Sequence, residues 1–303
     1  MGLVRLLIPT PVVPSIMLDM QYRMHPAISR FPSLEFYNMS LHDGTVDAAG
    51  NVHPELHPPM SSHLEANMLT GHRPPVVFLD HGGSETAKDR SRVNWNEAHI
   101  VCSIVEDLLL RNEVCNSRCR HSNFSPRAGK HLRGEDIGVI APYAAQISLL
   151  TRLLNTDAKY HKRFLSTLGD YRAMQLSDIE VKTVDGFEGR EKDVIIFSTV
   201  RNNPSGYIGF LADRRRLNVG LTRAKRGLFV VGSISTLRSG KMTKGQGNGG
   251  TTIHRCRGAE AWRRYAEYLM EHGMVLSLTG ERLHQVLYGS TPSSNHPIEY
   301  TAI

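Results

Sequence analysis

The chain has 303 residues, with 36 Lys and Arg against 29 Asp and Glu, so its formal net charge is +7. A content of 40% hydrophobic and 21% charged residues is typical of a globular protein with a sizeable core, which excludes a disordered chain. No apolar run reaches the roughly 18–20 residues that span a bilayer, and four cysteines are too few for a disulfide scaffold. We therefore expect no membrane partner and a reducing, cytoplasmic setting, since the basic segments contain no clear nuclear-localisation run. The positive charge favours an anionic partner.

Short β-branched runs alternate with helical patterns along the chain. One helix is expected after Asn94, which can cap it, with Glu97 at the capping-box position. Further helices are expected over about 144–154 and 259–272. The alternation predicts an α/β fold with a doubly wound, mostly parallel sheet, helices on both faces, and ligands at the carboxyl ends of the strands. The expected strands are 76–80, 137–141, 179–183, 194–198 and 228–232.

Three segments interrupt this alternation. Residues 38–74 are rich in Pro, His, Asn and Ser, and residues 111–134 hold six Lys or Arg and one acid, so both read as insertions. Residues 236–257 include a glycine-rich stretch and predict a flexible loop. Ligand-type side chains in the second segment lack a standard zinc spacing, so we expect free thiols and no metal site. These side chains are Cys115, Cys119 and His121.

The first block whose side chains could bind a ligand is residues 18–26, which read LDMQYRMHP. The ring face of Tyr22 can stack on a purine, and the planar guanidinium of Arg23 can bridge anionic oxygens. The alternative is that Tyr22 is a packed core aromatic and Arg23 a structural ion-pair donor.

Two further blocks lie beside expected strands. Residues 181–193 read VKTVDGFEGREKD, and residues 215–225 read RRLNVGLTRAK. Glycines in the former let backbone N–H groups approach a phosphate or ribose, and Thr183, at the carboxyl end of a strand, can touch a nucleic-acid phosphate. From residue 201 to 226 there are seven Lys or Arg and one acid, a self-repelling concentration unless an anion lies nearby.

Together with IAPYAAQ at 140–146, these blocks resemble, in this order, the second RecA-like domain of superfamily-one helicases. The branch is that of the nonsense-mediated-decay RNA helicase (regulator of nonsense transcripts) and senataxin, and the similarity covers roughly residues 16–235. It implies a RecA-like, P-loop-NTPase-type fold and the C-terminal motor domain of an ATP-dependent nucleic-acid helicase, with RNA preferred over DNA. The expected divisions are a remnant of a preceding lobe (1–15), the domain (16–235), the loop (236–257), a closing helix and strand (258–280) and a tail (281–303).

The resemblance also implies residue roles. Arg223, with Arg23 as its companion, reaches the transferring phosphoryl group and is catalytic, while Tyr22 contacts the adenine. The turn at Pro142 and Tyr143 presents an aromatic ring to a single strand, and burial of Tyr143 against the next helix is an alternative of equal weight. The implied nucleotide-binding residues are Gln21, Tyr22, Arg23, Gly189, Glu191 and Arg223. The implied nucleic-acid-binding residues are Pro142, Tyr143, Thr183, Asp185 and Arg201.

The sequence contains no G-x-x-x-x-G-K-[ST] motif and no strand that ends in the Asp-Glu pair expected to hold Mg²⁺. The resemblance therefore implies that ATP with Mg²⁺ is held mainly by an N-terminal RecA-like lobe, in the same or another chain, and that this chain alone is inactive. The other implied partners are single-stranded RNA or DNA and protein regulators. The main alternative is a non-enzymatic nucleic-acid- or protein-binding module derived from such a lobe, and a less favoured one is a self-sufficient hydrolase with an unrecognised phosphate loop.

Two structural expectations follow from the resemblance. Gly220 stands where the family usually has Ala, which predicts a helix loosened by up to about 1 kcal/mol. The motor interpretation further requires Arg23 and Arg223 to lie close together, on one side of the sheet.

Overall fold

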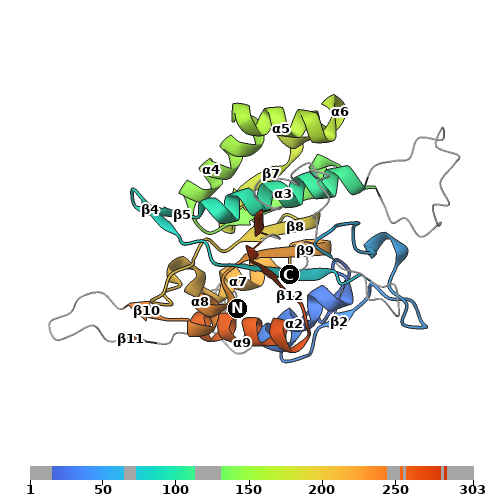
Figure 1. Cartoon of the computed structure of the whole chain (residues 1–303). Helices are drawn as coiled ribbons and strands as arrows, with labels where there is room; N and C mark the ends of the chain where they lie inside the picture. Colours follow the sequence, from blue (N-terminus) through green and yellow to red (C-terminus); the bar gives the residue numbers. More distant parts are fainter. Residues whose placement is uncertain are drawn as a thin grey trace, which may run out of the picture.

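The computed structural model describes residues 16–64, 73–112, 131–243, 253–254, 257–280 and 283–284. Its centre is a six-stranded sheet in the order β12-β3-β9-β8-β6-β7, in which every neighbouring pair is parallel (Figure 1). All five strands expected from β-branched runs are present. The strands are β3 (Val76–His81), β6 (Ile137–Ala141), β7 (Glu180–Thr183), β8 (Lys192–Ser198), β9 (Ala224–Gly232) and β12 (Val275–Leu278).

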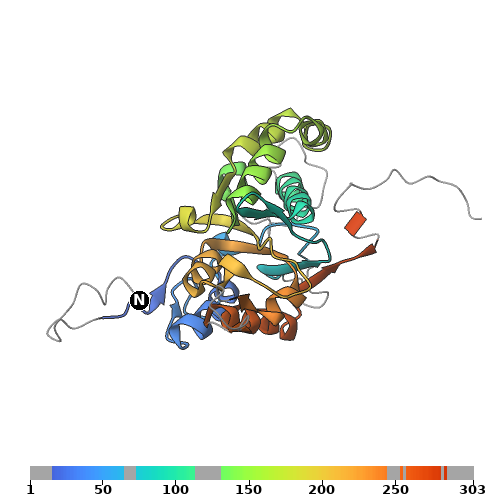
Figure 2. The same cartoon turned by 90° about the vertical axis from the view of Figure 1, so that its left-hand side faces the viewer.

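Helices cover both faces of the sheet, as the alternation of strands and helices predicts (Figure 2). The fold is therefore α/β and of the RecA-like, P-loop-NTPase type. One layer consists of α3 (Trp95–Arg111), α4 (Ala144–Asn155) and α5 (Ala158–Leu168), with the short α6 (Asp170–Met174) beside it. The other consists of α2 (Pro26–Tyr37), α7 (Arg214–Leu221), α8 (Ile234–Ser239) and α9 (Arg257–Glu271).

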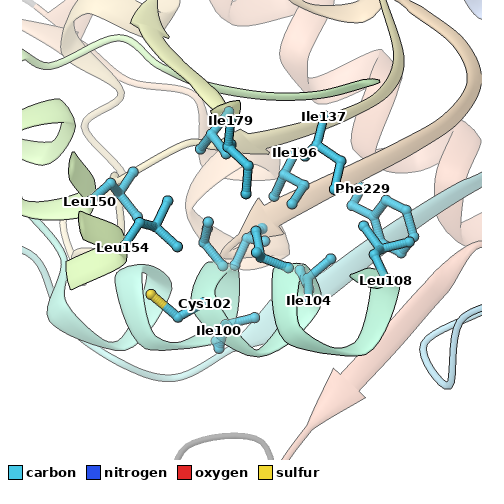
Figure 3. Close-up of a cluster of buried hydrophobic side chains, with 14 of the residues drawn as sticks. Ile100, Cys102, Ile104, Leu108, Ile137, Leu150, Leu154, Ile179, Ile196 and Phe229 are labelled. Atoms are coloured by element: carbon cyan, nitrogen blue, oxygen red, sulfur yellow. The ribbon is translucent and has the colours of Figure 1, made fainter. Parts of the chain in front are cut away.

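Each layer has its own apolar core against the sheet. On the first face, side chains of α3 and α4 interdigitate with alternate residues of the strands (Figure 3). On the second face, Trp262 of α9 is fully buried against Phe197 of β8, with ring centroids 5.9 Å apart. The first core includes Ile100, Ile104, Leu108, Ile137, Leu150, Leu154, Ile179, Ile196 and Phe229.

The start of α3 confirms one prediction and corrects another. Asn94 is the N-cap, and its side chain accepts the backbone N–H of Glu97 at 3.1 Å. The capping-box role of Glu97 is wrong, because the backbone N–H of Asn94 donates to Gln146 Oε1 at 2.9 Å and the buried carboxylate of Glu97 has other donors. It accepts the hydroxyl of Ser198 at 2.6 Å and the N–H of Val200 at 2.7 Å. The donors at the end of β8 need a buried acceptor, and Glu97 supplies it.

Gly220 has a packing role that the helix-propensity argument did not anticipate. A Cβ atom at this position of α7 would lie 2.4 Å from Cε1 of Phe197. The glycine lets α7 approach β8 more closely than an alanine could without a shift of the ring.

The segments that interrupt the alternation are mostly irregular in the part that the structure describes. Within 38–64, regular structure is limited to β2 (His42–Asp43), which pairs with β1 (Met20–Gln21), and one turn of 3-10 helix (Pro54–Leu56). The expected loop at 236–257 contains the end of α8 and a ribbon of β10 (Met242–Thr243) and β11 (Ile253–His254), so it is not loop throughout.

Several expectations fall outside the described residues: the leader at 1–15, most of the basic insertion with Cys115, Cys119 and His121, and nearly all of the tail. In the part of the chain that the structure describes, no helix is long and apolar enough to cross a membrane. A β4–β5 hairpin (Thr86–Lys88 and Ser91–Val93) projects beside α4.

Candidate functional site

The turn after β1 is built around the side chain of Gln21. Its Oε1 accepts the N–H groups of Arg23 and Met24 at 2.9 and 2.7 Å, and its Nε2 donates to the carbonyl of Met24 at 2.8 Å and to Asp43 at 2.5 Å. The amide is buried, and both its oxygen and its nitrogen have hydrogen-bond partners. Gln21 therefore shapes the turn that carries Tyr22 and Arg23.

Tyr22 presents its ring to solvent. The side chain is 76% exposed, so the packed-core alternative does not describe it. The ring lies against Gly44, where a Cβ atom would come within 2.3 Å of Tyr22 Cε1. One part of the ring thus rests on a residue without a side chain, and the remaining surface is open for stacking.

Arg23 belongs to a cluster of one carboxylate and two cations. Its Nε lies 2.5 Å from Glu191 Oε2, and Lys225 Nζ lies 2.9 Å from Glu191 Oε1. Hydrogen bonds from Arg23 and then Lys225 lower the pKa of Glu191 below its ordinary value. The backbone N–H of His25 donates to the carbonyl of Lys225 at 2.7 Å, which ties the turn to the start of β9.

Arg223 meets Arg23 at the carboxyl end of α7. Its Nη2 donates to Thr222 Oγ1 at 2.9 Å and its Nε to the carbonyl of Val219 at 3.1 Å, while Arg23 Nη1 donates to the carbonyl of Thr222 at 3.1 Å. Burial, and then repulsion by Arg23, lowers the pKa of Arg223. The helix-end carbonyls hold two like charges close together, and a phosphate oxygen would relieve their repulsion.

This basic cluster, formed by Arg23, Arg223 and Lys225 around Glu191, lies at the amino ends of two central strands. Glu191 directly precedes β8 and Arg223 directly precedes β9. The residues with implied nucleotide contacts thus lie at the amino ends of these strands and not at the carboxyl ends, where ligands of such sheets are expected, because the turn after β1 and the end of α7 both reach the amino-terminal side of the sheet. Gly189, also near this edge, has a φ of +79°, a conformation that favours glycine.

A groove of about 320 Å³ lies instead at the carboxyl ends of β6 and β7. Four of the five residues implied to contact the strand line it: Pro142, Tyr143, Thr183 and Asp185. The carboxylate of Asp185 pairs with both Nε and Nη2 of Arg216, at 3.0 and 2.8 Å. Asp185 thereby orients a guanidinium beside the groove.

Tyr143 lies in the wall of the groove, but its side chain is almost completely buried. The residue is 3% exposed, and its hydroxyl accepts the N–H of Phe210 at 3.3 Å and Nη1 of Arg201 at 3.2 Å. Its ring packs on that of Phe210, with centroids 5.4 Å apart. The prediction of an exposed stacking ring at 143 is therefore wrong, and the packed alternative describes it.

Arg201 is buried and forms an ion pair within the protein, so in this structure it is not available for the implied contact with the strand. It is 8% exposed, and its Nε lies 2.9 Å from Glu85 Oε2. It follows Val200, whose φ of +70° is unusual for a branched residue and of the kind that surrounding contacts must hold. The hydrogen bond from the backbone N–H of Val200 to Glu97 provides such a contact.

Phe210 and two arginines complete the groove, and the sequence argument missed all three. Phe210 is 55% exposed, and the guanidinium carbon of Arg216 lies 5.8 Å from its ring centroid. Arg90, at the tip of the β4–β5 hairpin, lines the same groove. The available signal was the position of Phe210 directly after Gly209, just upstream of the arginine-rich block.

The described residues contain no group of three or more His, Cys, Asp or Glu that could hold a metal ion. The side chains brought together at Arg23 and Arg223 suit phosphate oxygens, so they fit the anionic part of ATP.

Comparison with known proteins adds independent information. Residues 3–235 match a family model described as an AAA domain. Helicase sen1 of Schizosaccharomyces pombe is 35% identical over 74% of this chain and 11% of its own length. A regulator of nonsense transcripts 1 homolog of Neurospora crassa is 36% identical over 73% of this chain and 17% of its own length. ATP-dependent helicase upf1 of Schizosaccharomyces pombe is 33% identical over 73% of this chain and 20% of its own length.

The chain therefore spans only about a fifth or less of the length of these relatives. The family match covers more than half of the chain, includes all three blocks, and agrees with the fold. The chain belongs to the AAA-domain family of superfamily-one helicase motor domains, of the regulator-of-nonsense-transcripts and senataxin type.

Proposed function

We propose that this chain is the second motor lobe of an ATP-dependent helicase that acts on single-stranded nucleic acid, preferably RNA. The observation that carries the proposal is the meeting of Arg23 and Arg223 at Thr222, from blocks 200 residues apart in the sequence. The relatives named as helicases support the activity, and the relative named as a regulator of nonsense transcripts supports RNA as the strand.

In this proposal, ATP lies between this lobe and a lobe with a P-loop. When bound, ATP with Mg²⁺ held by that other lobe supplies a phosphoryl group whose transfer develops negative charge. Arg23 and Arg223 stabilise that charge, and the open face of Tyr22 receives the purine. Glu191 keeps Arg23 and Lys225 oriented in the absence of a phosphate.

The second helical layer offers a physical link between the basic cluster and the groove. Helix α7 has eight residues, hence a length of about 12 Å. Arg216, in its first turn, lies at the groove, and Arg223 follows its last turn. Engagement of a phosphate by Arg223 would therefore act on the same rigid helix that borders the strand site.

The test is the rate of strand-stimulated ATP hydrolysis by this chain when joined to the P-loop lobe of a relative. Arg223→Ala should lower kcat by about 10³-fold or more with strand affinity retained, since a catalytic arginine is worth that much. Arg215→Ala, which removes an exposed arginine of the same helix, is the matched control and should leave kcat unchanged.

Unchanged turnover in Arg223→Ala would refute the role of Arg223. Salt-sensitive strand binding without any hydrolysis by the joined protein would instead favour the non-enzymatic binding module.

A further inference from the structure

Phe210 is an aromatic ring held in place at the edge of the groove. Its backbone N–H donates to Tyr143 Oη, and its ring packs on the ring of Tyr143. Gly209 has a φ of +53°, and a Cβ atom there would lie 2.7 Å from both Tyr143 Oη and Arg201 Nη1. The glycine lets the chain pass closely over these two buried side chains, so Phe210 is held on the side of Tyr143. The rest of the ring is partly exposed, with the Arg216 guanidinium carbon 5.8 Å from its centroid.

The exposure of Phe210, which lies in a 3-10 turn, contrasts with the burial of the phenylalanines in the sheet. Phe78, Phe197 and Phe229 are almost completely buried, whereas Phe210 is 55% exposed beside a hollow. Exposure of an apolar ring to water is unfavourable, so a ligand that covers the ring gains free energy. Because the ring is already held in place, binding costs little conformational entropy.

The surroundings of the ring select the chemistry of its occupant. Arg90 and Arg216 line the groove with Asp185, which leaves an excess of one positive charge. Thr183, whose side chain carries a hydroxyl, lines it as well. A flat, apolar ring face next to cationic and hydroxyl groups matches a nucleotide, whose base stacks and whose phosphate carries the charge.

We propose that Phe210 is the base-stacking platform of this groove. The inference rests on the proposed function, because it requires a single strand in the groove. Stacking on Phe210 holds the strand without regard to sequence, since every base has a ring face. Tyr143 then acts as a positioning residue that supports Phe210 from behind.

The test is equilibrium binding of the whole chain to fluorescent single-stranded oligouridine and to an abasic strand of equal length and charge. Phe210→Ala should weaken oligouridine binding about 5- to 140-fold, equivalent to a loss of roughly 1–3 kcal/mol. It should leave the abasic strand unaffected, and the slope of log affinity against log salt should not change, because no phosphate contact is lost.

Two variants control for the fold and for the ring. Phe210→Trp should retain binding, and Tyr171→Ala, which removes an exposed aromatic on α6, should not alter it. Equal weakening on both strands, or no weakening by Phe210→Ala, would overturn the stacking role while leaving a salt-sensitive strand site intact. No salt-sensitive binding by the unmodified chain would overturn the strand site itself and the platform with it.

Discussion

At the scale of single residues, the position of Tyr22 depends on the absence of a side chain at Gly44. The ring would collide with a Cβ atom at position 44. Because the ring is exposed, it could move away from that atom into solvent. A stacking surface is useful only in one orientation, because stacking strength depends on the geometry of the two rings.

Gly44→Ala should therefore displace the ring of Tyr22 and raise the KM for ATP of the joined two-lobe protein several-fold, with strand affinity unchanged. Steady-state ATP hydrolysis measures this. Gly82→Ala is the matched control, because a Cβ atom at Gly82 meets nothing within 4 Å. An unchanged KM in Gly44→Ala would show that the ring of Tyr22 does not contribute to nucleotide binding.

Residue types predicted part of the site and misjudged another part for a physical reason. Arg23, Glu191 and Arg223 come from three blocks to which the family resemblance assigns nucleotide contacts, and the structure brings them together. The sequence could not decide between exposure and burial of Tyr143, because the burial depends on Phe210, 67 residues further along the chain. The same holds for Glu97, whose partners lie more than 100 residues away.

At the scale of elements, the first turn of α2 contains a pH-sensitive cap. Nδ1 of His25 accepts the backbone N–H of Ala27 at 3.1 Å, which requires an unprotonated nitrogen. Burial, and then the nearby His57, lowers the pKa of His25 to about 4, against an opposing effect of Asp43. The cap is thus stable only while the imidazole is neutral.

Because the pKa is depressed in the folded state, the unfolded chain takes up a proton first as the pH falls from about 6.5. The free energy of unfolding should decrease by about 2 kcal/mol between pH 7 and pH 5 from this group, and by at most about 3 kcal/mol near pH 4. Denaturant unfolding at both pH values measures the loss. His25→Asn keeps a capping acceptor that does not titrate, so its decrease should be smaller by that amount. An equal decrease in both proteins would contradict the assignment.

Strands were predicted correctly where their apolar residues follow the pattern that packing in the core requires. Buried parallel strands need nearly continuous apolar runs, so the five runs in the sequence were found at or within a few residues of their limits. Polar segments that fold over the surface lack such a pattern. The 3-10 turn carrying Phe210 (Gly209–Ala212) and the β4–β5 hairpin carrying Arg90 are of this kind.

At the scale of the whole molecule, two sites lie at opposite ends of the strands of the sheet. The basic cluster lies at the amino ends of β8 and β9, and the groove lies at the carboxyl ends of β6 and β7. Helix α7 runs between them, with Arg216 near one end and Arg223 after the other. In the proposed motor, nucleotide and strand are thus bound apart and coupled through one rigid element.

The central claim is that Arg23 and Arg223 act together on one phosphate. The most direct measurement is strand-stimulated kcat for Arg23→Ala, Arg223→Ala and the double variant in the joined two-lobe protein. The account predicts a loss of about 10³-fold in each single variant and little further loss in the double variant, because residues that act as a unit are not additive. Full activity of either single variant, or losses that multiply as for independent sites, would contradict it.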